Sequence, residues 1–293
     1  MTDVIHPPYQ NWWHSSSNKT GLAMALALQK IHAVTTPAHT LELYSHHLFG
    51  HVLVVDDCLY SIEHDPGYRE MLIHVPLLGR RREQCRVLLL GGDGAILREV
   101  LRHDFVTEVV VCEDEPALLA MQTELLGFDA EFSDPRVRHS PLAAPTALKT
   151  FALDDGGFDL IVCLAPSTTL QPQALAACLT DKGVCVDSDW LVVGLNQQGW
   201  YRDTNETGES LLSLAVQGIS FSAIQHYYGV SPWMTGYRGF FLYTKDAHSY
   251  SEPYFDYTGN HYNAELHRAA FALPTFWPKA MAQSAASQIG AIL

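Results

Sequence analysis

The chain has 293 residues, of which 47% are hydrophobic and 17% are charged, and this balance excludes a disordered protein. Its 32 acidic residues outnumber its 18 lysines and arginines, which gives a formal net charge of −14 at pH 7. Nucleic acids and anionic membranes are therefore poor partners for this protein, and small cations are better ones.

The first part of the chain alternates apolar and polar residues in short runs. Three of these runs, residues 40–44, 51–55 and 59–62, predict strands. Residues 22–31 are rich in alanine, which suits a helix by composition, although pairing with the strands would favour β structure instead. We expect residues 1–66 to form a small antiparallel β domain.

The pattern changes at Asp65-Pro66-Gly67, and a domain boundary is predicted there. Residues 68–76 have a helical period, and Pro76 is expected to end that helix. A strand, a glycine turn, an amphipathic helix and a second strand follow between Val87 and Glu113. We assign residues 67–293 to one larger domain.

The rest of this domain continues to alternate helices and strands. The predicted elements are a helix from Pro116 that Gly127 closes, strands from Val137 and over 158–163, a helix over 173–179, and a strand from Gly183. Helices between strands predict a parallel sheet, which binds ligands at the carboxyl ends of its strands. The residues at such ends are Asp93, Glu113, Leu164 and Asp187.

The glycine turn is the strongest functional signal in the sequence. Gly91, Gly92 and Gly94 allow a tight turn and a close approach to a ligand. Glu113 ends the next strand, where an acid can accept hydrogen bonds from two ribose hydroxyls. Asp93 places a negative charge where a pyrophosphate would lie, so a nucleoside without phosphates fits better, ideally a sulfonium cation. An ordinary glycine turn followed by an exposed acid also fits the pattern.

Cellular location and metal content follow from simpler features. No window approaches the roughly 18 apolar residues of a membrane span, and the first residues do not form a basic segment followed by an apolar one. Six scattered cysteines without a Cys-x-x-Cys pair indicate reduced, buried thiols. We expect a cytoplasmic protein without a membrane segment. The histidines, including His46, His47 and His51, lack the spacing of a metal site, so no metal is expected.

The chain resembles the spermidine synthase (polyamine aminopropyltransferase) family over nearly its whole length. The segments that carry the resemblance are 49–56, 68–71 with 74–77, 91–94 with 97–100, 134–137 and 262–274. The resemblance implies a small amino-terminal β domain on a Rossmann-like domain of the class I methyltransferase type, in a homodimer. It also implies transfer of an aminopropyl group from decarboxylated S-adenosylmethionine, a co-substrate rather than a tightly bound cofactor, to putrescine or a related diamine.

The resemblance assigns roles to individual residues. Gly91, Gly92, Gly94 and Glu113 match the nucleoside site, and Asp93 matches an acid that contacts both the sulfonium and the diamine and serves catalysis. Tyr68 and Tyr227 match tyrosines that wall the substrate channel. Glu42 stands where the family has a nucleoside-contacting glutamine, and Arg69 puts a cation where a cationic substrate is expected.

The sequence departs from the family after the strand over 158–163. Leu164 replaces the acid that accepts the proton, and Ser167 replaces a second amine-binding acid. We hypothesise that Asp187 and Asp189, two residues apart at the end of the next strand, supply the displaced negative charge. The alternative is a polar strand end with a helix-capping role.

Three functions remain open. The first, a divergent aminopropyltransferase, rests on the whole-chain resemblance with Asp93 and Glu113. The second is a methyltransferase-like enzyme on the same fold, in which Arg69 meets the carboxylate of intact S-adenosylmethionine. The third is a catalytically inactive relative that binds a nucleoside or dimerises with an active partner.

Overall fold

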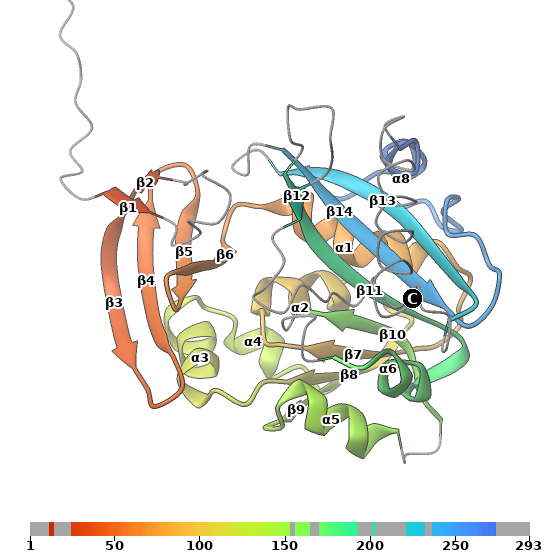
Figure 1. Ribbon diagram of the computed structural model, residues 1–293, viewed down its shortest axis with the longest axis horizontal. Helices are drawn as coiled ribbons and strands as arrows, with labels where there is room; N and C mark the ends of the chain where they lie inside the picture. The colour runs from red at the N-terminus through yellow and green to blue at the C-terminus, as the bar shows by residue number, and fades with distance from the viewer. Residues whose placement is uncertain are drawn as a thin grey trace, which may run out of the picture. The chain divides into compact units, whose positions relative to one another are not determined.

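The computed structural model describes residues 12–14, 25–152, 156–164, 170–192, 201–202, 221–231 and 236–273. The chain divides into two compact units, Met1–Asp65 and Pro66–Leu293. In Figure 1 the first unit carries strands β1 to β6, and the second carries the larger sheet and all the labelled helices. The two units are described separately below.

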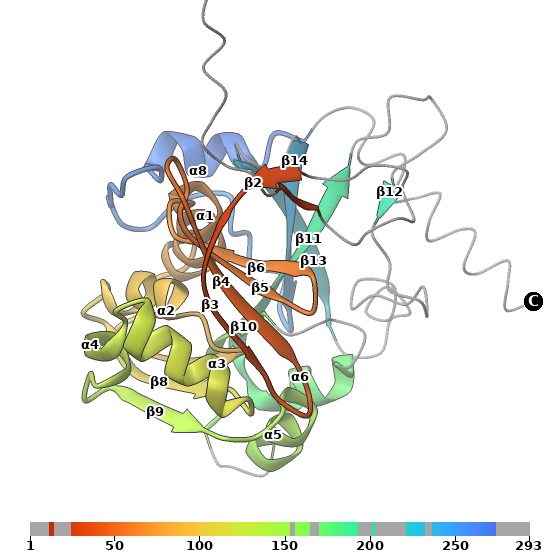
Figure 2. The same ribbon diagram turned by 90° about the vertical axis from the view of Figure 1, so that its left-hand side faces the viewer.

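Unit 1 contains a four-stranded antiparallel sheet in the order β3-β4-β5-β6, with a separate pair β1-β2 (Figure 2). Its strands are β1 (Trp12–His14), β2 (Ala25–Ala27), β3 (Gln29–Thr35), β4 (Thr40–His46), β5 (Gly50–Val55) and β6 (Cys58–Ile62). Leu41, Leu43 and Leu53 are fully buried and form its core. In the described part of the alanine-rich run, pairing with β4 and β1 produces strands rather than a helix.

Unit 2 is built on one mixed sheet in the order β13-β14-β11-β10-β7-β8-β9, with β12 paired to β11. Its strands are β7 (Cys85–Leu90), β8 (Val106–Cys112), β9 (Val137–Ser140), β10 (Phe158–Cys163), β11 (Leu179–Val192), β12 (Tyr201–Arg202), β13 (Ala223–Ser231) and β14 (Gly236–Thr244). The strands from β11 to β9 in this order are parallel, whereas β14 runs antiparallel to both of its neighbours, β11 and β13. The predicted parallel sheet is confirmed and is extended by an antiparallel hairpin.

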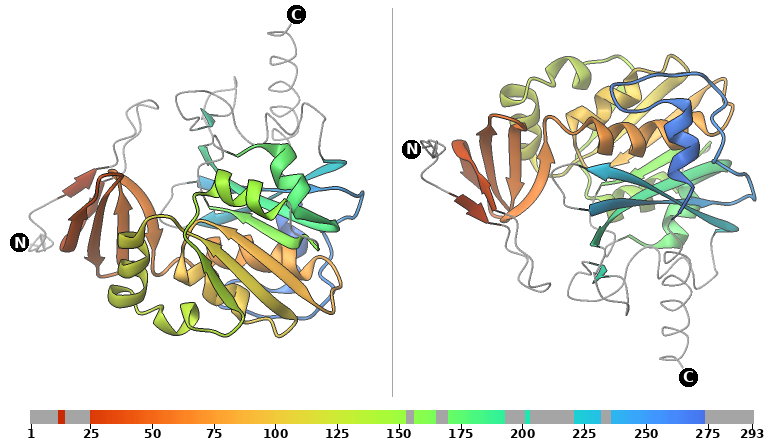
Figure 3. Two further views of the ribbon diagram at one scale, coloured as in Figure 1. Left: turned by 90° about the horizontal axis from the view of Figure 1, so that it is seen from below. Right: turned by 90° about the horizontal axis from the view of Figure 1, so that it is seen from above.

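Helices cover both faces of this sheet, as Figures 1 and 3 show. They are α1 (Pro66–Leu78), α2 (Gly94–Leu101), α3 (Pro116–Ala120), the π-helical turn η1 (Met121–Leu125), α4 (Asp129–Phe132), α5 (Ala144–Phe151), α6 (Pro172–Cys178) and α8 (Ala264–Ala270). On one face, Leu72 of α1 and Leu97 of α2 join a buried cluster with Val186 of β11. On the other face, Leu148 of α5 and Leu175 of α6 pack with Cys185.

The structure corrects three sequence-based expectations. Helix α1 passes through Pro76 and ends at Leu78, because a proline in the last turn removes only one backbone donor while Gly79 N–H still bonds to the Val75 carbonyl at 2.9 Å. The predicted helix from Pro116 is divided into α3 and η1. Strand β11 continues to Val192, so Asp187 does not stand at its end. The alanine- and serine-rich tail lies outside the described residues.

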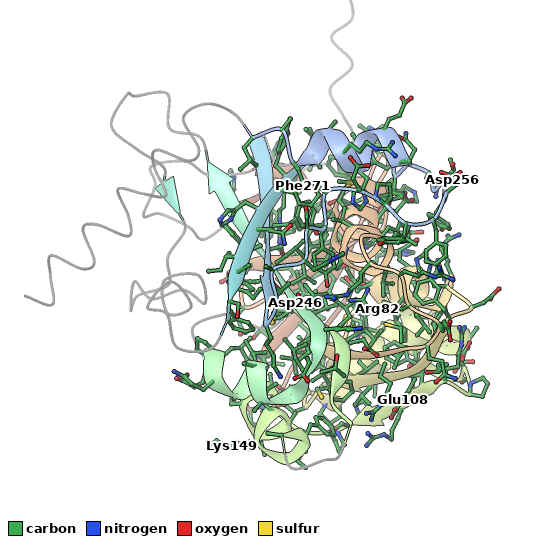
Figure 4. The ribbon with its side chains drawn as sticks, turned by 90° about the vertical axis from the view of Figure 1, so that its right-hand side faces the viewer. Arg82, Glu108, Lys149, Asp246, Asp256 and Phe271 are labelled. Carbon is green, nitrogen blue, oxygen red and sulfur yellow. The ribbon has the colours of Figure 1, made fainter. Side chains whose placement is uncertain are left out.

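The basic run after α1 has a structural role in unit 2. Arg80 pairs with Asp246 at 2.6 Å. Arg82 donates to the Pro76 carbonyl at 3.1 Å and to the Tyr250 hydroxyl at 3.3 Å. Figure 4 labels Arg82 and Asp246 on this side of the unit. These bonds attach the segment before β7 to the carboxyl-terminal part of the chain.

Candidate active site

The glycine turn lies where the strand order of the sheet changes direction. β7 precedes the turn and pairs with β8 on one side and with β10 on the other. Gly91 has a φ of +118°, which favours glycine, and its N–H donates to the Cys112 carbonyl at 2.9 Å. Leu164 N–H donates to the Leu90 carbonyl at 2.9 Å. The carboxyl ends of three strands therefore meet at this turn, which is where open sheets of this kind bind ligands.

Asp93 caps helix α2, and the donors of the first helical turn are already bonded within the protein. Its Oδ1 accepts hydrogen bonds from Ala95 N–H at 2.8 Å and Ile96 N–H at 3.2 Å. Leu97 N–H bonds to the Asp93 carbonyl at 2.9 Å, and Gly94 N–H bonds to the side chain of Gln122 at 3.2 Å. A phosphate could bind these four donors only by displacing protein bonds, so this helix end does not form an anion site.

Glu113 directly follows β8 and is largely buried. Its Oε2 accepts a bond from Gly92 N–H at 3.0 Å, and its Oε1 accepts one from Glu115 N–H at 2.9 Å. Burial raises the pKa of Glu113 above its usual range, although these two backbone donors oppose the shift. The carboxylate at the end of β8 is thus held against the glycine turn by these two hydrogen bonds.

Gln122 is a further component of this turn that the sequence analysis missed. It lies in η1 and its side chain is 1% exposed. Its amide nitrogen donates to the Gly92 carbonyl at 3.1 Å, and its amide oxygen accepts the bond from Gly94. No motif marks this glutamine, because both bonds join it to residues about thirty positions earlier in the chain.

A second polar group lies on β11 and β14. The Tyr68 hydroxyl of α1 is 3.1 Å from Ser188 Oγ, and Arg238 Nη2 donates to the same oxygen at 3.1 Å. The Arg238 guanidinium lies 4.3 Å from the centre of the Tyr68 ring. One face of this tyrosine is therefore covered by a cation of the protein itself.

The hypothesis that Asp187 and Asp189 replace the missing acids depends on how β10 and β11 pair. The two strands are adjacent, as expected, and Asp187 is the register partner of Cys163, the residue before Leu164. Asp187 is buried, and its side chain shares a sheet face with Cys163 and Cys185. Tyr68 packs on the opposite face. Asp189 lies on β11 too, but its side chain and residue Ser167 are outside the described part of the structure.

The chain is similar to known spermidine synthases. The spermine/spermidine synthase domain matches residues 65–185. A spermidine synthase of Schizosaccharomyces pombe is 27% identical over 302 residues, covering 94% of this chain and 96% of that protein. A polyamine aminopropyltransferase of Thermoanaerobacter sp. (strain X514) is 26% identical over 277 residues, covering 90% and 96%. Residues 65–185 thus carry a spermine/spermidine synthase domain, and nearly the whole chain is similar to spermidine synthases and polyamine aminopropyltransferases.

Solved structures of similar proteins have the same fold as this chain. The spermidine synthase of Thermotoga maritima superposes with a TM-score of 0.75 at 24% sequence identity, covering 94% of this chain and 96% of that one. A spermidine synthase in complex with the transition state analogue AdoDATO gives the same TM-score and identity, with coverage of 95% and 96%. The Rossmann-like fold with a small antiparallel amino-terminal sheet is confirmed.

The remaining residues with roles implied by the spermidine synthase family lie in different surroundings. Arg69 is largely buried in α1. Tyr227 is 0% exposed, and its hydroxyl donates to the Met71 carbonyl at 2.9 Å, so it belongs to the core of unit 2 in this structure. In unit 1, the carboxylate of Glu42 bonds to Lys30 and accepts a bond from the Tyr44 hydroxyl at 3.0 Å. Their contacts with substrates stay predictions.

Metal ligands, membrane-spanning helices and cysteines can each be assessed for the described residues. No group of three or more His, Cys, Asp or Glu side chains there could hold a metal ion. No helix in the same part of the chain is both long and apolar enough to cross a lipid bilayer. All six cysteines fall within it and are free thiols, with Cys58 exposed and the others buried.

Proposed function

We propose that the protein is an aminopropyltransferase that transfers the aminopropyl group of decarboxylated S-adenosylmethionine to putrescine or a related diamine. The spermine/spermidine synthase domain over residues 65–185 and the similarity to spermidine synthases support this function. The observation that carries it in this chain is the pair of buried acids at the switch in strand order, with Asp93 within the glycine turn and Glu113 bonded to Gly92 of that turn. In the proposal Glu113 binds the ribose, and Asp93 attracts the two cationic substrates.

The reaction is a displacement at the carbon bonded to the sulfonium. The amine lone pair forms the new N–C bond, the S–C bond breaks with its electrons going to sulfur, and methylthioadenosine leaves. The attacking amine must be neutral and must lose one proton. An alkyl amine with a pKa of about 10.4 requires roughly 4 to 5 kcal/mol to give up its proton at pH 7. An in-line geometry and a nearby carboxylate lower this barrier.

Which group accepts the proton is a separate part of the proposal. Leu164 has no acid to offer, and the hypothesis assigns the missing negative charge to Asp187 and Asp189. Asp187 lies beside Cys163, the residue before Leu164, and this position favours Asp187 as a replacement for the missing acid. However, Asp187 and Tyr68 lie on opposite faces of the sheet, which argues against direct contact between Asp187 and an amine bound beside Tyr68. Replacing both aspartates by asparagine tests the hypothesis, and unchanged turnover would contradict it.

The central experiment is an assay of the purified full chain. It is incubated with decarboxylated S-adenosylmethionine and putrescine, and methylthioadenosine and the aminopropylated amine are quantified by mass spectrometry. We expect both products in equal amounts. Methylthioadenosine without an aminopropylated amine would indicate hydrolysis of the donor, and neither product with any diamine would contradict the proposed function.

Calorimetry with both sulfonium compounds separates the alternatives. Preference for the decarboxylated form supports aminopropyl transfer. Preference for intact S-adenosylmethionine supports the methyltransferase-like alternative, in which Arg69 would meet the carboxylate. Binding of neither form supports an inactive relative.

We further propose that the protein acts as a cytoplasmic homodimer. The family resemblance supports the dimer, and six free cysteines support a reducing compartment. Light scattering on the full chain should give twice the protomer mass of 32.6 kDa. A mass equal to that of one protomer across the working concentration range would contradict the dimer.

A further inference from the structure

Gln122 connects two peptide groups of the glycine turn through a single side chain. Its amide nitrogen donates to the Gly92 carbonyl at 3.1 Å, and its amide oxygen accepts from Gly94 N–H at 3.2 Å. The two ends of the amide have opposite polarity and each meets a matching backbone group. A side chain of the same shape with two acceptors or with no polar group would lose at least one of these bonds.

The same turn is held from the other side by Glu113. Gly92 N–H donates to Glu113 Oε2 at 3.0 Å, so side chains bond to both polar groups of Gly92. A glycine turn has no side chains of its own to pack, and glycine has the widest range of backbone conformations. Its conformation therefore depends on partners supplied by other segments, and Gln122 and Glu113 are two of these.

The backbone of Gln122 also fixes the residue that covers the turn. Its carbonyl accepts a bond from Phe128 N–H at 3.2 Å. The Phe128 ring packs so closely on Gly94 that a Cβ there would lie 2.3 Å from it. Gln122 belongs to η1, a π-helical turn, and such turns frequently occur at functional sites. This turn holds both the amide and Phe128 against the start of α2.

We propose that Gln122 is a positioning residue that keeps the glycine turn in the conformation required for nucleoside binding. It acts through Gly92, which bonds to Glu113, and through Gly94, and these two glycines flank Asp93 in the chain. The inference rests on the proposed function, because it assumes that a nucleoside binds at this turn. It assigns to Gln122 no contact with the substrate.

Two variants test the role of the amide. Gln122→Met keeps the length of the side chain without its hydrogen bonds. Gln122→Glu keeps the shape, but an ionised carboxylate cannot donate to the Gly92 carbonyl, whereas a protonated carboxyl can donate to it and still accept from Gly94. The exposed Glu124 lies on the same turn, so Glu124→Gln is the matched control.

The measurement is calorimetric titration of each full-length variant with methylthioadenosine over a range of pH. At pH 8 we expect both Gln122 variants to bind roughly tenfold more weakly than the original chain, since a buried hydrogen-bonded pair is lost. As the pH falls, the ratio of affinities between Gln122→Glu and the original chain should rise toward one, while that for Gln122→Met stays low. Gln122→Met adds no charge beside Glu113, so its ratio at each pH removes the titration of Glu113 and gives the reference for the Gln122→Glu series.

Kinetics separate positioning from general damage. With the decarboxylated donor and putrescine, the KM of the donor should rise in both variants, and the KM of putrescine should stay within about twofold. Equal rises in both KM values would overturn the inference. Unchanged methylthioadenosine affinity in Gln122→Met, or a flat affinity ratio for Gln122→Glu, would overturn it too.

Each outcome also bears on the proposed function in a different way. If the original chain binds methylthioadenosine and the Gln122 variants bind it equally well, only the role of Gln122 is wrong. If the original chain does not bind it, the proposed nucleoside site is wrong, and the inference falls with it. If Gln122→Met does not fold, the pH series of Gln122→Glu decides alone.

Discussion

Asp93 combines a structural task with a predicted electrostatic one. Its Oδ1 caps α2 through Ala95 and Ile96, and its charge is predicted to attract the cationic substrates. Asparagine caps helices about as well as aspartate, but it is uncharged. The two tasks can therefore be separated by one substitution.

For Asp93→Asn we expect kcat/KM for aminopropyl transfer to fall at least tenfold, a loss of about 1.4 kcal/mol or more of transition-state stabilisation. The midpoint of thermal unfolding should change little, because the cap is retained. The exposed Asp129, in the first turn of α4, provides the control Asp129→Asn. Activity equal to that of the control would rule out an electrostatic role for Asp93.

Arg238 should affect the amine acceptor. Its guanidinium lies over Tyr68, which is predicted to wall the substrate channel, and a positive charge there repels a diamine. We expect Arg238→Gln, which keeps a hydrogen-bond donor for Ser188, to lower the KM of putrescine by roughly threefold or more. The exposed Arg268 of α8 supplies the control Arg268→Gln. An unchanged or higher KM in Arg238→Gln would contradict this prediction.

Only part of the site could be predicted from individual residues. Glu113 was identified because it directly follows a strongly apolar strand, and Asp93 because it lies in the glycine turn after another such strand. The bond from Tyr68 to Ser188 joins residues 120 positions apart, and that from Arg238 to Ser188 joins residues 50 positions apart. Such contacts are created by the folding of the sheet, so no local pattern in the sequence indicates them.

At the scale of elements, helices α1 and α2 share a buried polar contact. His74 Nδ1 is 2.9 Å from His103 Nε2, and Glu99 lies beside His74 at 3.3 Å and Arg102 at 2.9 Å. The ring of Tyr257 packs on both histidines. Burial and the neighbouring His74 lower the pKa of His103 to about 3. His103 therefore stays uncharged in the folded protein at pH values between about 3 and 6.5, at which an exposed histidine would be protonated.

This shift predicts a loss of stability in acid. Between the ordinary histidine pKa of 6.5 and the folded-state value of about 3, the unfolded chain binds a proton at His103 that the folded chain does not. Stability should therefore fall as the pH falls, by about 1.4 kcal/mol per pH unit from this group. Denaturant unfolding between pH 7 and 4 measures the slope. His103→Gln should reduce it by about one proton, whereas His64→Gln, at an exposed site, should not. Equal slopes in the two variants would contradict the assignment.

Elements differed in how well the sequence predicted them. The strand over 158–163 was predicted to the residue, because an apolar run this dense must be buried on both faces. β11 was placed too short, since Asp187-Ser188-Asp189 is polar and looked like a strand end. The backbone of β14 pairs with β11 from Val184 to Leu191 and continues the strand regardless of side-chain polarity. The hairpin β13–β14 was not predicted at all.

At the scale of the whole molecule, the net charge of −14 should matter for encounter with substrates. A field of this sign attracts a sulfonium cation and a diamine, and salt screens it over a Debye length of about 10 Å at 0.1 M. We expect kcat/KM for the decarboxylated donor to fall on the order of threefold between low and high salt. The neutral product methylthioadenosine serves as the control, since its inhibition constant should barely change. Equal salt dependence for both ligands would contradict steering by the net charge.

The two sides of the proposed site differ in what maintains them. The glycine turn is held by side chains, Glu113, Gln122 and Asp93, that bond to specific backbone groups. The strands that carry Ser188 and Arg238 are held together by the backbone hydrogen bonds between β11 and β14, which do not depend on side-chain identity. Over evolutionary time, charged residues on β11 and β14 can change one at a time while the backbone pairing of the two strands persists. Descendants of this protein would accordingly change the amine they accept well before they change the nucleoside they bind.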